Sequence, residues 1–385
     1  MRIILVAYSF YETDNRVRRY AEALANRGDH VDVIAIAREG SKKYEKISGV
    51  NVYRIQHRKV NEKSRRDYFF RIFLFFIKSF FSISWRHLKT PYDLVHVHSV
   101  PDFEVFAALL PKITGSRILL DIHDLVPEFY SSKFKVKINN PIVVMLKLIE
   151  RVCCSFANHV IISNELWRSV LISRSVKSEK CTTVINYPDT NIFSYRGIKK
   201  TDSSFLIIYP GTLNYHQGVD ILVRAMVYVK DITPVIKLNI YGSGPQISEL
   251  IDIIENNGLQ SNVFMHNMIP LEEIAKIMAQ ADLGVVPKRS EGFGNEAFST
   301  KTLEFMALGV PVLASGTKID HYYFNDSVVE FFNPGDVKQL SQKILYLYSD
   351  QNRRDLLVKN ALEYVRENCW SKKQIDYFNI VDEKK

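Results

Sequence analysis

Cysteine is scarce in this sequence, and its few occurrences exclude two kinds of framework. The chain of 385 residues has four cysteines, of which Cys153 and Cys154 are adjacent and the other two lie far away. This spacing fits neither a zinc site nor the disulfide framework of a small secreted domain. No basic region with an apolar stretch and a cleavage site precedes the strand-like run Ile3–Ala7, so no signal peptide is expected. We therefore expect a cytoplasmic protein with reduced thiols.

Common nucleotide-binding motifs are also missing. No G-x-G-x-x-G follows the first strand-like run, and no Walker A sequence occurs. These absences disfavour a nicotinamide-dependent dehydrogenase and a P-loop kinase, because both classes hold phosphates with such loops. Zinc-finger, homeodomain and aromatic RNA-reading motifs are absent as well, so nucleic acid is not expected as a partner.

Acidic residues are in the minority in the first half of the chain. Residues 1–190 hold 30 Lys and Arg against 19 Asp and Glu, whereas the remainder holds 21 against 23. Because 46% of all residues are hydrophobic and 24% are charged, the chain has the balance of a folded globular protein. The basic first half indicates an anionic partner, such as a phospholipid surface or a lipid pyrophosphate.

Short apolar runs alternate with helix-like segments along the whole chain. Runs rich in Val, Ile and Leu between helices indicate parallel sheets that are buried on both faces. The pattern restarts near residue 203, after a stretch rich in turn formers. It therefore predicts an α/β protein with two Rossmann-like, doubly wound domains. The expected strands are Ile3–Ala7, Val31–Ile36, Leu94–Val97, Ile118–Ile122, Val160–Ile162, Phe205–Tyr209, Ile236–Tyr241, Val263–Met265, Leu283–Val286 and Pro311–Ala314.

The same pattern gives domain boundaries. We expect an N-terminal Rossmann-like domain over 1–188, a linker over 189–203 and a C-terminal Rossmann-like domain over 204–369. The segment 370–385 is expected to form a helix that crosses back to the first domain. Trp370 is either a core aromatic or the marker of that crossing.

The segment Tyr68–Leu88 combines many phenylalanines with basic residues. Arg71 and Lys78 lie inside it, so it does not fit a membrane-spanning helix. Two interpretations stay open: a helix whose aromatics pack into the first domain, or an interfacial helix that touches anionic lipid through 58–88.

Two glutamates seven residues apart mark the strongest candidate site. Glu296 and Glu304 lie in EGFGNEAFSTKTLEFMALGVPVLAS, where Ser299 is a good N-cap for a short helix over 300–308. A helix N-terminus offers free N–H groups to a phosphate. The dipole alone contributes only about 0.3–1 kcal/mol per charge, so a nucleotide diphosphate needs further donors.

This segment, and nearly the whole chain with it, resembles the retaining glycosyltransferases of family four. The resemblance implies the GT-B fold, in which two Rossmann-like domains face each other across a cleft. It also implies that Glu296 lies by the donor sugar hydroxyls and that Glu304 holds the ribose. Backbone amides that would reach the sugar and the diphosphate belong to Phe298, Ser299 and Thr300.

A second match is the segment YPGTLNYHQGVDILVRA. Gly211 lets a ligand approach the backbone closely. Many family members carry Arg after the first glycine and Lys before the second, and both bind the diphosphate. Here Thr212 and Gln217 stand in those places, so the clamp must use other cations. The candidates are Lys288, Arg289, Lys301 and, from the first domain, Arg16.

Two further loops agree with the family pattern. Gly242 and Gly244, after a strand, suit a turn beside the base or ribose. The resemblance implies that backbone groups of the loop 266–270, which contains Met268, read the base. Which base they read does not follow from the sequence.

Histidines at strand ends mark the first domain. His123 follows the strand Ile118–Ile122, and a residue at the carboxyl end of a parallel strand points to where α/β folds bind ligands. The resemblance identifies it with the histidine that contacts the transferred sugar. Alternation puts His96 and His98 on one face of their strand, where His98 either lines the acceptor side or packs structurally. Arg16 is placed to meet a phosphate of donor or acceptor.

The resemblance implies a front-face retaining route, in which the leaving diphosphate helps to deprotonate the incoming hydroxyl. The enzyme then mainly positions groups and stabilises charge on the phosphates. No strong D-x-D loop motif occurs, so no metal and no other cofactor is expected. The catalytic candidates are His123 and Glu296.

The sequence therefore predicts a hexosyltransferase that moves a sugar from a nucleotide-diphosphate sugar to a glycan or lipid-linked acceptor, in surface polysaccharide synthesis. Two alternatives stay open. One is a sugar-nucleotide binding protein without activity, motivated by the missing Arg and Lys. The other is a nucleotide-sugar epimerase of GT-B architecture.

Overall fold

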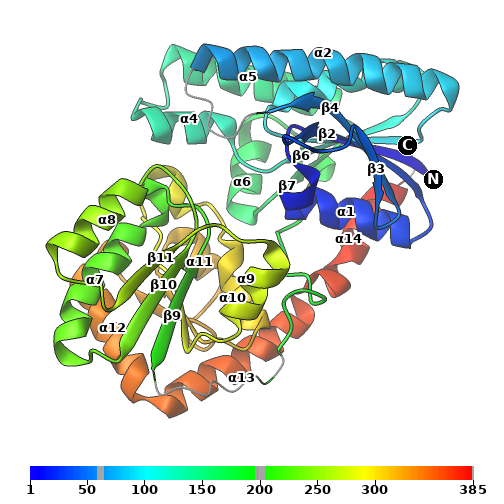
Figure 1. Ribbon diagram of the computed structural model, residues 1–385. Helices are drawn as coiled ribbons and strands as arrows, with labels where there is room; N and C mark the ends of the chain where they lie inside the picture. Colours follow the sequence, from blue (N-terminus) through cyan, green and yellow to red (C-terminus); the bar gives the residue numbers. More distant parts are fainter. Residues whose placement is uncertain (59–64, 196, 198–203, 384–385) are drawn as a thin grey trace. The chain divides into compact units, whose positions relative to one another are not determined.

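The computed structural model describes residues 1–58, 65–195, 197 and 204–383. The chain forms two compact units, which are coloured along the sequence in Figure 1. Unit 1 comprises Met1–Asn186 and Gln374–Lys385, and unit 2 comprises Tyr187–Lys373. The last helix therefore belongs mainly to the first unit. Residues 59–64 of the segment 58–88, which one of the two open interpretations places against lipid, lie outside the described residues.

Unit 1 is built on an eight-stranded sheet in the order β3-β4-β2-β1-β5-β6-β7-β8. All neighbouring strands are parallel except β3 and β4, which pair antiparallel at the edge. The strands are β1 Arg2–Ala7, β2 His30–Ala37, β3 Tyr44–Ile47, β4 Val50–His57, β5 Leu94–His98, β6 Arg117–Ile122, β7 His159–Ile162 and β8 Cys181–Thr183.

Helices cover both faces of this sheet, which keeps its apolar strands away from water (Figure 1). They are η1 Tyr11–Thr13, α1 Asn15–Asn26, α2 Arg65–Lys89, η2 Asp102–Ala108, α3 Leu109–Ile113, α4 Val126–Phe134, α5 Pro141–Phe156, α6 Glu165–Arg174, η3 Ser178–Lys180 and α14 Trp370–Asp382, where η marks a 3₁₀ helix. None of the described helices is long and apolar enough to cross a membrane.

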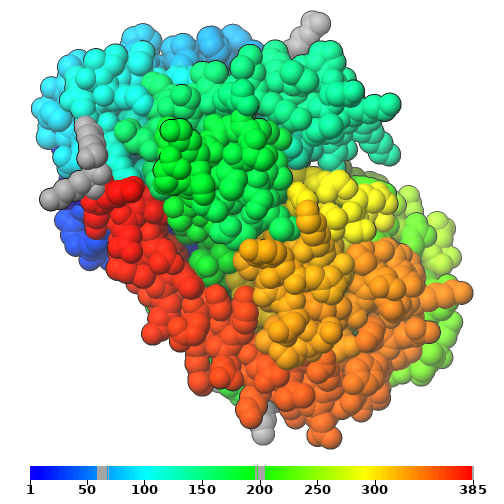
Figure 2. Space-filling view, turned by 180° about the vertical axis from the view of Figure 1, so that it is seen from behind, coloured from blue at the N-terminus to red at the C-terminus, as the bar shows by residue number. Residues whose placement is uncertain are grey.

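The C-terminal helix α14, red in Figure 2, packs on the rest of unit 1. The hydroxyl of Tyr377 lies 3.0 Å from Nδ1 of His96, and Arg27 donates to Asp382 over 2.8 Å. Trp370, at the helix start, is buried, and its N–H donates to the carbonyl of Pro188.

Unit 2 has a six-stranded parallel sheet in the order β11-β10-β9-β12-β13-β14. Its strands are β9 Phe205–Pro210, β10 Ile236–Tyr241, β11 Val263–His266, β12 Leu283–Val286, β13 Val312–Ser315 and β14 Glu330–Phe332. Its helices are η4 Tyr215–Gln217, α7 Val219–Ile232, α8 Ile247–Asn256, α9 Leu271–Met278, η5 Gly292–Asn295, α10 Thr300–Ala307, α11 Lys318–Tyr323, α12 Val337–Ser349 and α13 Gln351–Glu367.

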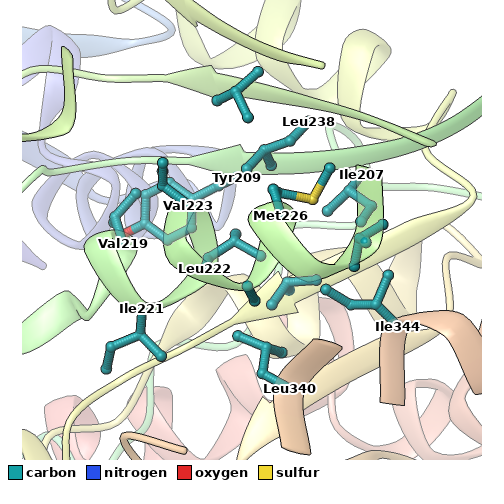
Figure 3. Close-up of a cluster of buried hydrophobic side chains, with 14 of the residues drawn as sticks. Ile207, Tyr209, Val219, Ile221, Leu222, Val223, Met226, Leu238, Leu340 and Ile344 are labelled. Carbon is teal, nitrogen blue, oxygen red and sulfur yellow. The ribbon is translucent and has the colours of Figure 1, made fainter. Parts of the chain in front are cut away.

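Figure 3 shows the core that holds one face of this sheet. Ile207 and Tyr209 of β9 and Leu238 of β10 meet Leu222 and Met226 of α7, and all of these side chains are buried. Burying one such side chain stabilises the fold by about 1.5–3 kcal/mol. This core fixes the strand ends that carry the loops described below.

The two α/β domains expected from the sequence are confirmed. Each of the ten expected strands is present within one or two residues of its expected ends. The sequence pattern missed β3, β4, β8 and β14, which are edge strands or lie next to the edge. All four cysteines are free and buried.

Candidate active site

Unit 1 has a polar pocket of about 180 Å³ at the carboxyl ends of three adjacent strands, β1, β5 and β6. The strand register places Ala7, His98 and Asp121 side by side at these ends. The pocket is lined by Ala7, Tyr8, Ser9, Asp14, His98, Ser99, Val100, His123 and Asp124. It therefore lies where doubly wound folds bind ligands.

A carboxylate beneath this pocket organises the side chains around it. Arg16 donates from Nε and Nη2 to the two oxygens of Asp121 over 2.7 and 2.8 Å, and both residues are buried. Oδ2 of Asp121 also lies 3.3 Å from Nδ1 of His98 and 3.5 Å from Nε2 of His123. His98 and His123 in turn lie 3.1 Å apart through Nδ1 and Nε2.

Burial and charge oppose each other in this cluster. Burial disfavours the ionised form of Asp121, but Arg16 and then His123 outweigh it and hold the pKa of the carboxyl well below its usual range. Burial lowers the pKa of His98 although Asp121 raises it. Burial and the neighbouring His98 keep the pKa of His96 far below its ordinary value. The cluster therefore holds a buried Arg–Asp ion pair, and burial favours the neutral form of His96 and His98 beside it.

Nitrogen and oxygen atoms of His96, His98 and Asp121 lie within 4.8 Å of one another, a spacing that could suit a metal ion. However, both oxygens of Asp121 accept hydrogen bonds from Arg16. A metal ion would have to displace this guanidinium or bind beside its positive charge. The donor set therefore fits an internal ion pair better than a metal centre.

The three site residues that were expected in unit 1 lie close together, but only two of them line the pocket. His98 and His123 line the pocket. Alternation correctly put His96 and His98 on one face, since their ring centroids lie 4.2 Å apart. Arg16 lies deeper, and besides Asp121 its Nη1 donates to the carbonyl of Val184 over 2.8 Å. Its guanidinium is thus engaged inside the unit.

In unit 2, loops after three neighbouring strands interlock through their backbones. The amide of Gly211 donates to the carbonyl of Tyr241, and the amide of Gly242 donates to that of His266. A Cβ on Gly242 would lie 1.9 Å from the carbonyl oxygen of Gly211, and one on Gly244 would lie 2.5 Å from that of Leu213. Only glycine fits at positions 242 and 244, because no side chain has room there.

Lys301 lies against this glycine loop from the first turn of α10. A Cβ on Gly211 would approach Cε of Lys301 to 2.7 Å, and the ammonium of Lys301 donates to Oε1 of Gln217 over 3.2 Å. The hydroxyl of Tyr209 donates to the same Gln217 oxygen and to the carbonyl of Thr212. Burial lowers the pKa of Lys301 to about 8, although Glu304, one turn further, raises it. Lys301 is therefore a cation that gains from a nearby anion.

The other two expected cations of unit 2 are engaged elsewhere. Lys288 is buried and forms an ion pair of 2.8 Å with Asp320. Arg289 forms one of 2.6 Å with Asp220 and donates to the carbonyl of Tyr215. Of the cations expected to form the clamp, Lys301 is therefore the one that touches the glycine loop.

Around the start of α10, the expected residues take different positions. Glu296, in the preceding loop, accepts a hydrogen bond of 2.7 Å from Lys318. Glu304 lies on α10, and Phe298 packs edge-on against Tyr323 with 5.0 Å between ring centroids.

One expectation about this helix start was wrong. Ser299 holds the N-cap position before Thr300, but its side chain makes no capping hydrogen bond. Its buried hydroxyl has no hydrogen-bond partner among the described residues, so the free amides at the start of α10 are not capped by this side chain.

Met268 lies in an exposed loop after β11, beside a flat aromatic pair. Tyr241 and His266 stack with their ring centroids 4.4 Å apart and their planes 12° apart. These rings end β10 and β11, next to the interlocked glycines.

The fold brings three further residues into these sites that the sequence did not predict. Asp121 gave only a weak signal, an acid inside an apolar strand beside the His123 position. Burial lowers the pKa of His216, and the nearby cations Lys301 and Lys288 lower it further. Lys318, the partner of Glu296, follows β13 and carried no motif at all.

Comparison with known families agrees with this architecture. Residues 14–191 match the model "Glycosyltransferase Family 4", and residues 193–364 match "Glycosyl transferases group 1". The two matched regions follow each other along the chain and together cover most of it. The chain belongs to the group 1 glycosyltransferases and has the GT-B fold of two α/β domains.

Individual relatives are distant. The chain is 24% identical to an uncharacterized glycosyltransferase of Methanocaldococcus jannaschii, over 94% of this chain and 93% of the relative. It is 27% identical to the O-antigen biosynthesis glycosyltransferase WclY of Escherichia coli, over 44% of each chain. These similarities accord with glycosyltransferase activity and with relatives that act in polysaccharide synthesis.

Solved structures share the fold over the whole length. Sucrose-phosphate synthase from Thermosynechococcus elongatus has a TM-score of 0.79 at 19% identity and covers 99% of this chain and 98% of that one. HepE from Anabaena, solved with UDP and glucose, has a TM-score of 0.74 at 15% identity and covers both chains fully, 100% of each.

Proposed function

We propose that this glycosyltransferase is a retaining, metal-independent hexosyltransferase. Its donor is a nucleotide-diphosphate sugar, and its acceptor is a hydroxyl of a glycan or lipid-linked saccharide in surface polysaccharide synthesis. The observation that carries the proposal is the contact of Lys301 with Gly211 and Gln217 at the start of α10. It supplies a cation where Thr212 and Gln217 replace the basic pair of many relatives.

The donor diphosphate would bind along this contact. Backbone amides at the start of α10 and at Gly211 donate to its oxygens, and Lys301 balances its charge. A charge-assisted hydrogen bond of this kind contributes about 1.5–3 kcal/mol. The stacked Tyr241–His266 pair and the Met268 loop lie nearby, which supports a base or ribose position there. HepE was solved with UDP, so uridine nucleotides are the first to test.

Transfer then breaks the bond between the anomeric carbon and the leaving phosphate oxygen. A bond forms between that carbon and the acceptor hydroxyl oxygen on the same face, and the hydroxyl proton passes to the leaving phosphate. The chain's contribution is to position the reactants and to stabilise the phosphate charge. Glu296 would accept hydrogen bonds from hydroxyls of the donor sugar, and Lys318 would hold its carboxylate in place.

Unit 1 would contribute the acceptor side. His123 and His98 line its pocket and would contact the transferred sugar and the acceptor hydroxyl. Asp121 would fix their orientation, because one of its oxygens lies within 3.5 Å of both rings. Its own charge is balanced by Arg16, so a neutral sugar meets no net charge there.

Donor screening tests the proposal. Purified protein is mixed with a panel of UDP-, GDP- and dTDP-sugars, and thermal unfolding is recorded, because a ligand bound to the native state raises stability. The donor that raises Tm is then incubated with a polysaccharide or lipid-linked acceptor extract, with and without EDTA. We expect transfer that EDTA leaves unchanged, and an anomeric configuration in the product, measured by NMR, equal to that of the donor.

Each alternative has its own outcome in this experiment. Binding without transfer or donor hydrolysis would identify a sugar-nucleotide binding protein. Conversion of the donor alone to an isomeric sugar nucleotide would identify an epimerase. An inverted product, or activity lost with EDTA, would overturn the retaining or the metal-independent part of the proposal.

A further inference from the structure

Helix α2 in unit 1 presents an apolar face to water. Its inward face, with Ile72, Phe75 and Ile83, is buried against the unit. The opposite face repeats large apolar residues every three or four positions, which places them on one side of the helix. They are Phe70, Phe73, Ile77, Phe81, Trp85 and Leu88. Phe81 is 65% exposed and Trp85 is 55% exposed. A surface helix of a globular domain normally turns polar residues outward, so the apolar outward face of α2 departs from the usual pattern.

Helix α5 also presents an apolar face to water. Val143, Cys153 and Cys154 face inward and are buried, while Val144, Met145, Leu148 and Val152 are exposed on the other side. Leu148 is 60% exposed. Single exposed apolar residues are ordinary, whereas two helices with continuous outward stripes mark an interaction surface.

The two stripes lie on helices that share a packing partner. Both helices pack against the same 3₁₀ helix, η2, and Figure 1 shows them along one edge of unit 1. Ile113, at the end of the neighbouring α3, is also exposed on the unit. We name the exposed apolar residues of α2 and α5 the apolar face.

Positive charges border the apolar face. Arg71, Lys78 and Lys89 lie in a row on one flank of the α2 stripe, and Lys147 and Arg151 accompany the stripe of α5. The acids of these helices offset one of these cations, Arg71, and leave Lys78, Lys89, Lys147 and Arg151. Asp67 of α2 pairs with Arg71, and the acid of α5, Glu150, is buried in an ion pair with Arg174.

Aromatic residues beside lysine and arginine are the composition of a helix that lies in a lipid–water interface. We propose that the apolar face docks unit 1 on an anionic lipid bilayer, with α2 and α5 lying along the membrane surface. The side chains of the two stripes enter the headgroup boundary, and the bordering cations meet lipid phosphates. The surface extends beyond the aromatic segment of α2, because α5 supplies four of its residues. This docking goes beyond the proposed transfer reaction and does not depend on the donor.

Vesicle sedimentation tests the docking, without donor or acceptor. The full chain is mixed with vesicles of phosphatidylcholine alone or with 30 mol% phosphatidylglycerol, about the anionic fraction that attracts basic surfaces. We expect binding to the anionic vesicles at least tenfold stronger than to the neutral ones, and weaker binding as salt rises. Absence of binding to the anionic vesicles would overturn the docking and would leave the transferase proposal untouched.

Two variants with matched controls separate the contributions. Phe81→Ser, Trp85→Ser and Leu148→Ser together should weaken anionic vesicle binding at least tenfold. The control, Ile232→Ser, Tyr346→Ser and Leu356→Ser, removes exposed apolar residues from unit 2 and should bind like the parent. Lys78→Glu with Lys89→Glu should also weaken binding, whereas Lys359→Glu with Lys372→Glu, at exposed positions of unit 2, should not.

The remaining occupant of such a face is a second copy of the chain. Light scattering on the parent and on the triple serine variant distinguishes it. A parent dimer that the triple variant dissociates, with equal vesicle binding by both proteins, would overturn lipid docking and assign the face to self-association. Folding of every variant is checked by its thermal unfolding, since all substituted side chains lie on the surface.

Discussion

The two units use the same architecture and offer different chemistry at their strand ends. In unit 1, the carboxyl ends of β1, β5 and β6 carry charged and imidazole side chains around Asp121. In unit 2, the ends of β9 and β10 carry glycines whose backbones interlock, and one lysine, Lys301, reaches them. Unit 1 therefore offers charged and imidazole side chains that hold one another in place, and unit 2 offers backbone N–H donors and the cation Lys301. The strand ends of unit 2 therefore suit an anion better than those of unit 1 do.

The largest expected effect breaks the side-chain network of unit 1. Asp121→Asn leaves the buried guanidinium of Arg16 without its counter-charge, and removing one partner of a buried ion pair costs about 3–5 kcal/mol. We expect that loss in the free energy of unfolding measured with urea. Asp67→Asn, which removes the exposed partner of Arg71, is the control and should cost under about 1 kcal/mol. Equal effects of the two substitutions would show that the network contributes little to stability.

The next effect concerns the backbone site of unit 2. Gly242→Ala would bring a Cβ to 1.9 Å from the carbonyl oxygen of Gly211, so the loops must separate. Overpacking of this kind costs about 1–3 kcal/mol, and here we expect the upper end in the free energy of unfolding. Ser243→Ala, at the exposed neighbour, should be close to neutral. Normal stability of Gly242→Ala would mean that the loops need no close approach.

A smaller effect tests the cost of buried carboxyls in unit 1 through pH. Glu104 of η2 is fully buried, its carboxylate oxygens have no hydrogen-bond partner among the described residues, and burial raises its pKa to about 8. The folded state therefore holds a proton that the unfolded chain loses near pH 4.5, so stability falls as pH rises from there to about 8.

Glu104→Gln removes this titration. It should raise the free energy of unfolding at pH 9, where the parent's unfolded chain is ionised at this position, and change it little at pH 4, where the carboxyl is protonated in both states. Urea unfolding of parent and variant at both pH values measures the difference, in which shifts from other groups cancel. A variant that gains equally at both pH values would contradict the assignment.

The two units also differ in how much of each could be predicted from the sequence. Ten strands were predictable, nine inside the sheets and β11 at an edge, because apolar runs of Val, Ile and Leu are typical of buried parallel strands. The edge strands β3 and β14 are short and carry polar residues, so the pattern passed over them. The loops of unit 2 were visible, since Gly242 and Gly244 sit at turns where no side chain has room.

The charge network of unit 1 could not be foreseen. Arg16, His98 and Asp121 lie far apart in the sequence, and only the strand register brings them together. The engagement of Lys288 with Asp320 was hidden for the same reason. Glycines in a sequence indicate where the backbone turns, whereas the pairing of buried charges depends on contacts that form only in the folded chain.

The central claim is that Lys301 replaces the missing basic pair in holding the donor diphosphate. Calorimetric titration of UDP, GDP and dTDP into the parent, Lys301→Ala and the control Lys359→Ala tests it directly. We predict that Lys301→Ala weakens binding of the preferred nucleotide more than tenfold, which corresponds to about 1.4 kcal/mol, and raises the donor KM accordingly, while Lys359→Ala binds like the parent. Equal affinity of the parent and Lys301→Ala for that nucleotide would contradict the account.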